Sequence, residues 1–338
     1  MKALWQIGRE RLHLQEVPTP APGPGEVLIR IVASALCGSE LGAYRSDRQG
    51  NNGGHEAAGV VAEVGAGVGR LRVGDRVGVC AVQGCGECGD CRQGRYTYCE
   101  GRSVVSGMHA EYVASRESAC HLLPDDVPWD VGVLLTGDGL GVPYHVAQRL
   151  KARAAQGTPV AVLGVGPVGL GNVLVQSRVG AEVVALDVSA HRLDLARRLG
   201  ATWTVAAPPG AEPAALAAAV REACGCAPQV CLECAGRQPT LLGALAAVAT
   251  GGTVVCIGEQ GTAPISPSAH LIRRDITLMG SWFYHFAEFP AMLDLYRDGL
   301  AVRDLITHHL PFAEAPEGFR QFSAGATGKV VLEYGVGG

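Results

Sequence analysis

The chain has 338 residues, of which 48% are hydrophobic and 18% charged, and its formal net charge at pH 7 is −4. This length suggests two domains, each able to bury a core, and the composition is that of a globular protein. The small negative charge argues against nucleic acid or an anionic membrane as a partner. The first residues lack the apolar core of a signal peptide and no apolar run is long enough to cross a bilayer, so we expect a cytoplasmic protein.

The first 120 residues or so are predicted to be rich in β-strands. Short apolar runs at 27–32, 59–64 and 76–82 alternate there with turns rich in Gly, Pro and Asp. From Pro159 the pattern changes to apolar strands that alternate with helical stretches. This alternation predicts a parallel, doubly wound sheet in the second half of the chain, and therefore an α/β fold class.

Further elements of the second half follow from the same periodicities. Helices are predicted at 189–199 and 211–222, and strands at 230–233 and 253–257. Ser189 is placed to cap the first of these helices. The segment 286–298 has a helical pattern but contains Pro290, which leaves the start of this helix open. The final predicted strand covers 329–334.

Four of the twelve cysteines are clustered in a glycine-rich loop with the spacing C-x2-C-x2-C-x7-C, namely Cys85, Cys88, Cys91 and Cys99. In a cytosolic chain of this size the spacing indicates a metal site rather than disulfides. Four thiolates complete the tetrahedral coordination of zinc and leave no open position, which is typical of a structural site. Four unligated thiols in a loop remain the alternative.

The stretch 160–187 carries a dinucleotide-binding pattern of strand, glycine turn, helix and second strand. Gly164 permits the tight turn, Gly166 lets the backbone approach a pyrophosphate, and Gly169 lets helix and strand pack closely. The helix N-terminus offers free N–H groups to the phosphates. Asp187, which ends the second strand, accepts hydrogen bonds from a ribose 2′-OH and repels a 2′-phosphate, so NAD is favoured over NADP. A βαβ unit without a ligand is the alternative.

A second set of metal-ligand residue types precedes this stretch. Cys37 lies in ALCGSE, His55 and Glu56 lie in GGHEAAG, and Asp138 lies in LLTGDGLG. A single buried cysteine is usually a small hydrophobe, and a single histidine is more often a core or surface residue. Their joint occurrence upstream of a dinucleotide-binding unit is what favours a functional interpretation.

In this order the motifs resemble those of the zinc-dependent medium-chain alcohol dehydrogenases, and the resemblance covers essentially the whole chain. It implies a GroES-like β-rich catalytic domain at 1–139 and 286–338, with a structural-zinc lobe at about 84–100. It further implies a Rossmann coenzyme domain with a doubly wound parallel sheet at 140–285. The active site is expected in the cleft between the two domains, where ligands commonly bind.

The resemblance also implies the ligands of a catalytic zinc. Cys37 and His55 correspond to two of them. Asp138 takes the third position, where the family usually has Cys or Glu, and a carboxylate is an acceptable zinc ligand. Glu56 is a ligand in some relatives and lies behind the ligands in others, so both roles stay open.

Two neighbours of Cys37 are implied to act with the metal. Ser39 matches the hydroxyl that takes the proton of the alcohol. Glu40 stands where an Asp is more usual and is expected to orient His55. Some relatives pass the proton on through a histidine where this chain has Gly42, so the route beyond Ser39 stays open.

The contacts to the coenzyme are implied for eight residues: Gly164, Gly166, Val168, Gly169, Asp187, Arg192, Gly258 and Lys329. Lys329 would meet the pyrophosphate, with a solvated surface lysine as the alternative, and Arg192 would flank the adenosine ribose.

The expected function is therefore that of a zinc-dependent oxidoreductase that moves a hydride between a secondary alcohol, polyol or sugar-like substrate and NAD. Two zinc ions per chain are expected, one catalytic and one structural, in a homodimer or homotetramer. A simple alcohol or threonine-type dehydrogenase of the same family stays an alternative. A zinc-free reductase would need neither cysteine set, and a zinc-binding regulator is disfavoured by the acidic balance and the aromatic content of 5%.

Overall fold

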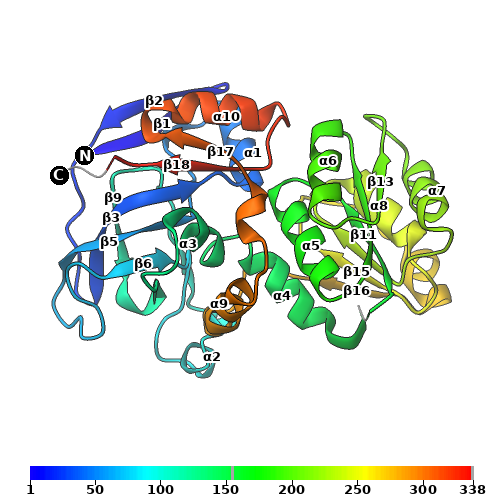
Figure 1. Ribbon diagram of the computed structural model, residues 1–338, viewed down its shortest axis with the longest axis horizontal. Coiled ribbons are helices and arrows are strands. Elements are labelled where there is room, and N and C mark those ends of the chain that lie inside the picture. Colours follow the sequence, from blue (N-terminus) through cyan, green and yellow to red (C-terminus); the bar gives the residue numbers. More distant parts are fainter. Residues whose placement is uncertain (154–155, 336–338) are drawn as a thin grey trace. The chain divides into compact units, whose positions relative to one another are not determined.

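The computed structural model describes residues 1–153 and 156–335. The chain divides into two compact units, one formed by residues 1–141 and 283–338 and the other by residues 142–282 (Figure 1). The first unit is therefore discontinuous in sequence, because its residues 283–338 follow the whole of the second unit. Within the described part of the chain, no helix combines the length and apolar character needed to cross a membrane.

The first unit is built on one mainly antiparallel sheet. Its strands lie in the order β10 (Cys120–Leu122), β6 (Arg76–Val79), β5 (Ala57–Val64), β3 (Glu26–Ala35), β18 (Lys329–Glu333) and β17 (Ile306–Pro311), and β9 (Tyr112–Arg116) also pairs with β3. The C-terminal strand β18 thus lies between β3, with which it is antiparallel, and β17, with which it is parallel. The predicted final strand at 329–334 is confirmed.

Smaller elements complete this unit. They are a three-stranded sheet of β1 (Lys2–Gly8), β2 (Arg11–Glu16) and β4 (Gln49–Asn51), a short pair of β7 (Val82–Gln83) and β8 (Ser103–Val104), and the helices α1 (Leu41–Arg45), α2 (Gly89–Arg92), α3 (Trp129–Leu135), α9 (Phe289–Arg297) and α10 (Ala315–Ser323). Helix α9 begins at Phe289, after a 3-10 turn at Phe286–Glu288, and Pro290 lies in its first turn. A proline there costs no hydrogen bond, because that N–H has no intrahelical acceptor.

The second unit is organised around a six-stranded, entirely parallel sheet. Its order is β13 (Trp203–Ala206), β12 (Glu182–Asp187), β11 (Pro159–Leu163), β14 (Val230–Glu233), β15 (Thr253–Cys256) and β16 (Thr277–Gly280). The connecting helices are α5 (Pro167–Arg178), α6 (Ala190–Arg198), α7 (Pro213–Cys224) and α8 (Gln238–Ala247), and α4 (Gly141–Leu150) leads in from the first unit. This arrangement confirms the predicted doubly wound sheet.

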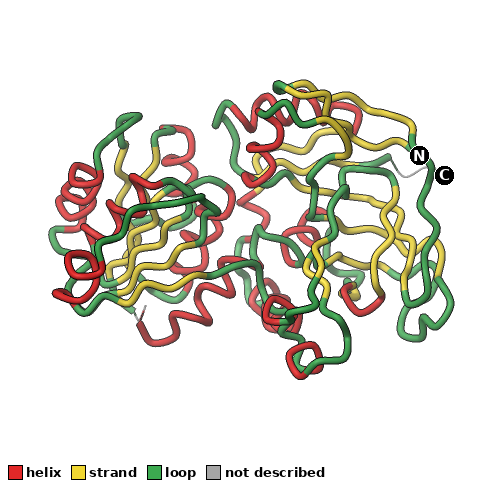
Figure 2. The backbone as a smooth tube through the Cα atoms, turned by 180° about the vertical axis from the view of Figure 1, so that it is seen from behind, coloured by secondary structure: helices red, strands yellow, loops and turns green. Residues whose placement is uncertain are grey.

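The helices lie on both faces of this sheet (Figure 2). Alternate residues of β11 and β12, such as Ala161 and Leu186, form a buried core with apolar residues of α7 and α8. Because both faces are covered, the central strands are continuously apolar. Helix α5 begins at Pro167, after the glycine turn that follows β11. Ser189 caps α6 by accepting the Arg192 N–H, as predicted.

Candidate active site

Three neighbouring strands of the first unit bring two of the expected metal ligands, Cys37 and Glu56, together with Lys329. Cys37 follows the end of β3, Glu56 precedes the start of β5, and Lys329 is the first residue of β18. Since β3 is antiparallel to both neighbours, these three positions lie at one edge of the sheet. The Ala35 N–H donates to the Glu56 carbonyl at 3.1 Å and fixes this register next to the site.

The four expected ligand residues form one buried cluster. One ligand atom from each of Cys37, His55, Glu56 and Asp138 lies within 4.8 Å of all the others. Oδ2 of Asp138 is 2.9 Å from Nε2 of His55 and 3.2 Å from Sγ of Cys37. The His55 Nδ1–H donates to the Gly53 carbonyl at 3.1 Å, which leaves the lone pair of Nε2 for a metal. A thiolate, an imidazole and carboxylates are ligands that zinc accepts.

The carboxylates of this cluster have oxygens that fit a cation. Oε2 of Glu56 and Oδ1 of Asp138 are buried without a hydrogen-bond partner. The carboxylate of Glu56 lies so close to Gly137 that a Cβ on residue 137 would be 2.7 Å from Oε2. A residue without a side chain is therefore needed at position 137. Buried polar atoms without partners are rare in folded proteins and call for an ion or a water as partner. The donor set therefore fits a metal site.

Lys329 lies at this cluster, where the sequence did not place it. Its side chain is 1% exposed, and its Nζ forms an ion pair with Oε1 of Glu56. Burial raises the pKa of Glu56 to about 7 even beside this ammonium group. Burial alone would lower the pKa of Lys329, but Glu56 and the neighbouring Cys37 and Asp138 raise it. Lys329 therefore balances charge at the cluster, and its contact with a pyrophosphate stays a prediction.

The two neighbours of Cys37 differ in exposure. Ser39 is exposed on a 3-10 turn, whereas Glu40 is buried. Glu40 does not form a direct hydrogen bond to His55, because its Oε1 is 3.8 Å from the His55 Nδ1. Its Oε2 is instead 2.9 Å from Nε2 of His109. Burial opposes ionisation, but His109 and His55 together hold the pKa of Glu40 below its usual value. His109 was not predicted, since a single histidine gives no motif.

Phe283 also lies at this cluster. Its ring lies edge-on to His55, with 5.8 Å between the centroids. Its backbone φ of 53° is in the left-handed region, which a phenylalanine rarely adopts. The contact places an apolar ring beside a candidate metal ligand, and the strained backbone shows that the surrounding structure holds it there.

The residues after Phe283 are anchored by a buried aromatic stack. The imidazole of His121 stacks on Phe286 and Phe289, with centroid distances of 3.8 and 4.3 Å. Its Nε2 is 3.2 Å from the hydroxyl of Tyr284, which donates to the Thr136 carbonyl at 2.8 Å. Burial lowers the pKa of His121 to about 3. The ring is therefore neutral at physiological pH and acts as part of the core.

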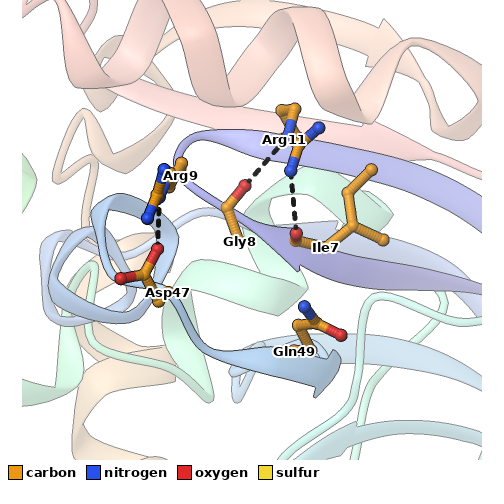
Figure 3. Close-up of a pocket in the computed structure, with 6 residues that line it drawn as sticks. All are labelled: Ile7, Gly8, Arg9, Arg11, Asp47 and Gln49. Carbon is orange, nitrogen blue, oxygen red and sulfur yellow. Dashed lines mark hydrogen bonds and ion pairs between the residues drawn. The ribbon is translucent and has the colours of Figure 1, made fainter.

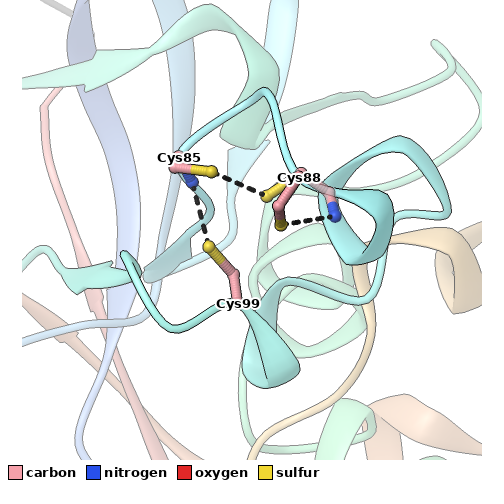
Figure 4. Close-up of side chains that lie close together, drawn as sticks. Cys85, Cys88 and Cys99 are labelled. Carbon is pink, nitrogen blue, oxygen red and sulfur yellow. Dashed lines mark hydrogen bonds between the residues drawn. The ribbon is translucent and has the colours of Figure 1, made fainter.

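The cysteine loop between β7 and β8 forms a separate cluster (Figure 4). Its four ligand atoms, from Cys85, Cys88, Cys91 and Cys99, also lie within 4.8 Å of one another. Backbone N–H groups point at two of the sulfurs: that of Cys85 at Sγ of Cys99, at 3.3 Å, and that of Cys91 at Sγ of Cys88, at 3.4 Å. Such N–H donors favour thiolates, so this loop fits a structural zinc.

The glycine turn of the second unit has the geometry that its sequence predicts. Gly164 has a φ of 91°, and a Cβ on Gly169 would lie 2.0 Å from the Gly164 carbonyl oxygen. Asp187 accepts the Val165 N–H with Oδ2 and the Ser189 N–H with Oδ1, both at 2.8 Å. The carboxylate is thus held next to the turn in a fixed orientation.

Seven of the eight expected coenzyme residues lie in this unit, and Lys329 lies in the other. A guanidinium nitrogen of Arg192 would be 3.8 Å from a Cβ on Gly166, so this side chain borders the turn. Burial lowers the pKa of Arg192 against the opposing effect of Asp187. Val168 is half-buried in the first turn of α5. Gly258 approaches the backbone so closely that a Cβ would lie 2.2 Å from the Gly236 nitrogen.

A surface pocket at the hairpin of β1 and β2 is lined by different residues (Figure 3). Its charged groups bind one another, since Nε of Arg9 is 2.5 Å from Oδ1 of Asp47. Arg11 donates to the carbonyl oxygens of Gly8 and Ile7 at 3.3 and 3.5 Å. Both arginines are therefore satisfied within the pocket.

Comparisons with known proteins identify the family of this chain. The alcohol dehydrogenase GroES-like domain matches residues 23–125, and the zinc-binding dehydrogenase domain matches residues 167–298. The sorbitol dehydrogenase of Gallus gallus is 34% identical over 341 aligned residues, which cover 95% of this chain and 93% of the relative. The chain belongs to the zinc-dependent medium-chain dehydrogenase family. This dehydrogenase is therefore an oxidoreductase with a GroES-like first unit and a Rossmann second unit.

Solved structures of similar proteins cover the dehydrogenase almost completely. The alcohol dehydrogenase TADH from Thermus sp. ATN1 has 28% identity and a TM-score of 0.83, with coverage of 99% of this chain and 100% of its own. The short chain alcohol dehydrogenase rspB from E. coli CFT073, in complex with the cofactor NADH, has 26% identity and a TM-score of 0.85, with coverage of 98% of this chain and 99% of its own.

Proposed function

We propose that this dehydrogenase transfers a hydride between a secondary alcohol, polyol or sugar-like substrate and NAD. The observation that carries the proposal is the buried cluster of Cys37, His55, Glu56 and Asp138, with its two unpartnered carboxylate oxygens. The likeness to a sorbitol dehydrogenase supports a polyol or another secondary alcohol as substrate. The likeness to a protein in complex with NADH supports the coenzyme.

Each residue of the first unit has a defined part in this proposal. Cys37, His55 and Asp138 would hold the catalytic zinc, and Glu56 would either bind it directly or stand behind these ligands. Zinc in such a site supplies Lewis-acid chemistry that lowers the pKa of an alcohol hydroxyl. The exposed hydroxyl of Ser39, on the turn that follows Cys37, would take up the proton of the alcohol.

The second unit would bind and orient the coenzyme. The N–H groups at the start of α5 face the phosphates of a dinucleotide in this fold. Asp187 would accept hydrogen bonds from the ribose hydroxyls and repel a 2′-phosphate, so that NAD is preferred to NADP. NAD supplies the hydride acceptor of the reaction. The loop of four cysteines would hold a second, structural zinc, and the assembly would be a homodimer or homotetramer, which light scattering tests.

Metal analysis and a substrate screen test the proposal together. Metal analysis of the purified protein should give two zinc ions per chain. Polyols and other secondary alcohols should produce NADH absorbance at 340 nm. Cys37→Ala should abolish turnover and leave one zinc per chain, while calorimetry still detects NAD binding.

Cys120→Ala is the matched control, because Cys120 is an equally buried thiol outside both clusters. This control should keep both zinc ions and the wild-type rate. Full turnover in Cys37→Ala, or two zinc ions retained there, would rule out the assigned metal site.

A further inference from the structure

Glu40 connects the Cys37 loop to a residue far away in sequence. Its Oε1 accepts the backbone N–H of Cys37 at 3.1 Å. Its Oε2 is bonded to Nε2 of His109 at 2.9 Å, across 69 positions of the sequence. The side chain of Glu40 is 1% exposed and that of His109 is fully buried. His109 is therefore the hydrogen-bond partner of the Glu40 oxygen that does not contact Cys37.

The imidazole of His109 is itself held in place on its other side. Its Nδ1 is 2.9 Å from Oγ of Ser34, and that hydroxyl is 3.0 Å from the hydroxyl of Tyr334. The ring of Phe319 meets the imidazole edge-on, with 5.8 Å between the centroids. Both ring nitrogens thus have partners, and the ring has one orientation.

His109 also contacts the loop that carries His55. Its backbone N–H donates to Oδ1 of Asn52 at 3.3 Å, and the same oxygen accepts the Gly54 N–H at 2.8 Å. A Cβ on Gly54 would lie 2.6 Å from Cδ2 of the His109 ring. The residue before His55 therefore packs directly against the imidazole. Through Glu40 and Gly54, one side chain contacts the Cys37 loop and the His55 loop, two of the segments that carry metal ligands.

We propose that His109 is a positioning residue of the metal site, which fixes the Cys37 loop and the His55 loop relative to each other. Residues behind metal ligands orient those ligands, and their loss weakens metal binding on the order of 10- to 100-fold. His109 has the contacts for this role with both loops at once. The inference rests on the proposed function, because it takes the Cys37 and His55 cluster to be the catalytic zinc site.

Two amide substitutions separate the role of the Glu40 contact from general packing. His109→Gln places an amide nitrogen near the position of Nε2 and keeps a donor for Glu40. His109→Asn places its amide near the position of Nδ1, so it keeps the Ser34 contact and loses Glu40. Both variants replace the ring by a neutral polar side chain.

The zinc dissociation constant of the Cys37 and His55 site, measured by chelator competition, is the main readout. His109→Asn should raise it on the order of 10- to 100-fold, whereas His109→Gln should change it much less. In cobalt-substituted protein, the visible absorption bands should shift in the Asn variant only. The loop of four cysteines, which has no part in these contacts, should keep its zinc in both variants.

Equal effects of the two variants, or no effect of either, would overturn the inference while the wild-type protein still binds two zinc ions and oxidises alcohols. A wild-type protein with no zinc in this cluster and no turnover would instead overturn the proposed function. If His109→Asn fails to fold, Glu40→Asp tests the inference instead, because the shorter aspartate side chain does not reach the imidazole of His109. A raised zinc dissociation constant in Glu40→Asp supports the inference, and an unchanged one contradicts it.

Discussion

The buried imidazole of His121 makes the first unit sensitive to acid, and His121→Phe should remove that sensitivity. In the unfolded chain, a histidine takes up a proton as the pH falls below about 6.5. In the folded protein, burial among aromatic rings lowers the pKa of His121 to about 3. The neutral, buried His121 therefore does not reduce the free energy of unfolding above pH 6.5. As the pH falls from 6.5 to 3, protonation of this histidine favours the unfolded chain, and the free energy of unfolding decreases progressively.

The size of this effect follows from the difference between the two pKa values. A pKa difference of one corresponds to about 1.4 kcal/mol, so the whole loss is roughly 5 kcal/mol, of which about 2 kcal/mol has occurred by pH 5. His121→Phe keeps an aromatic ring against Phe286 and Phe289 and cannot be protonated. It loses the hydrogen bond with Tyr284, at a cost of about 1 kcal/mol at every pH.

Urea unfolding at pH 8 and at pH 5 measures this difference. Two of the four tryptophans, Trp5 and Trp129, lie in the first unit. In a background with Trp203→Phe and Trp282→Phe, the fluorescence therefore reports on the first unit alone. The wild-type free energy of unfolding should fall between pH 8 and pH 5 by about 2 kcal/mol more than that of His121→Phe.

Tyr284→Phe is the matched control. It removes the hydrogen bond to His121, together with the one to the Thr136 carbonyl, but keeps the imidazole. It should therefore lower stability at both pH values and retain the wild-type dependence on pH. The reasoning is refuted if His121→Phe keeps the wild-type difference between pH 8 and pH 5, since the imidazole would then not be the group that titrates.

Three further substitutions test other parts of the molecule. Asp187→Gly should raise KM for NAD relative to NADP, because the carboxylate that reads the ribose is lost; an unchanged preference in steady-state kinetics would contradict this role. Cys88→Ser should lower the thermal midpoint and release one zinc before kcat changes, and a selective fall in kcat in a stable protein would show that the two metal sites were confused. Gly169→Ala should weaken NAD binding in calorimetry and destabilise the second unit by about 1–3 kcal/mol, because its Cβ would meet the Gly164 carbonyl oxygen. Gly261→Ala, which has open space around its Cβ, should do neither.

The parts of the fold that could be predicted from the sequence are those encoded locally. The strand before Gly164, the turn, α5 and the strand that ends at Asp187 are consecutive, so their pattern can be read without knowing which distant segments touch. The same holds for the loop of four cysteines. Helix α3 was not predicted, because six of its seven residues are buried and it shows no alternation of apolar and polar faces.

Contacts between single residues far apart in sequence could not be predicted. Glu40 lies 69 positions from His109, and Glu56 lies 273 positions from Lys329. Nothing near Lys329 in sequence distinguishes a buried lysine from a surface one, since β18 reads as an ordinary apolar strand. The resemblance to a family supplied the metal ligands, but it could not indicate that the longer side chain of Glu40 is paired with His109.

The order in which the ribosome makes the chain has a consequence for the metal site. Residues 142–282 form a continuous unit and are complete before β17 and β18 exist. The sheet of the first unit is complete only when β18 pairs with β3 and brings Lys329 to Glu56. During synthesis, all residues of the second unit are therefore present before Lys329, the counter-ion of the Glu56 carboxylate, has been added to the chain.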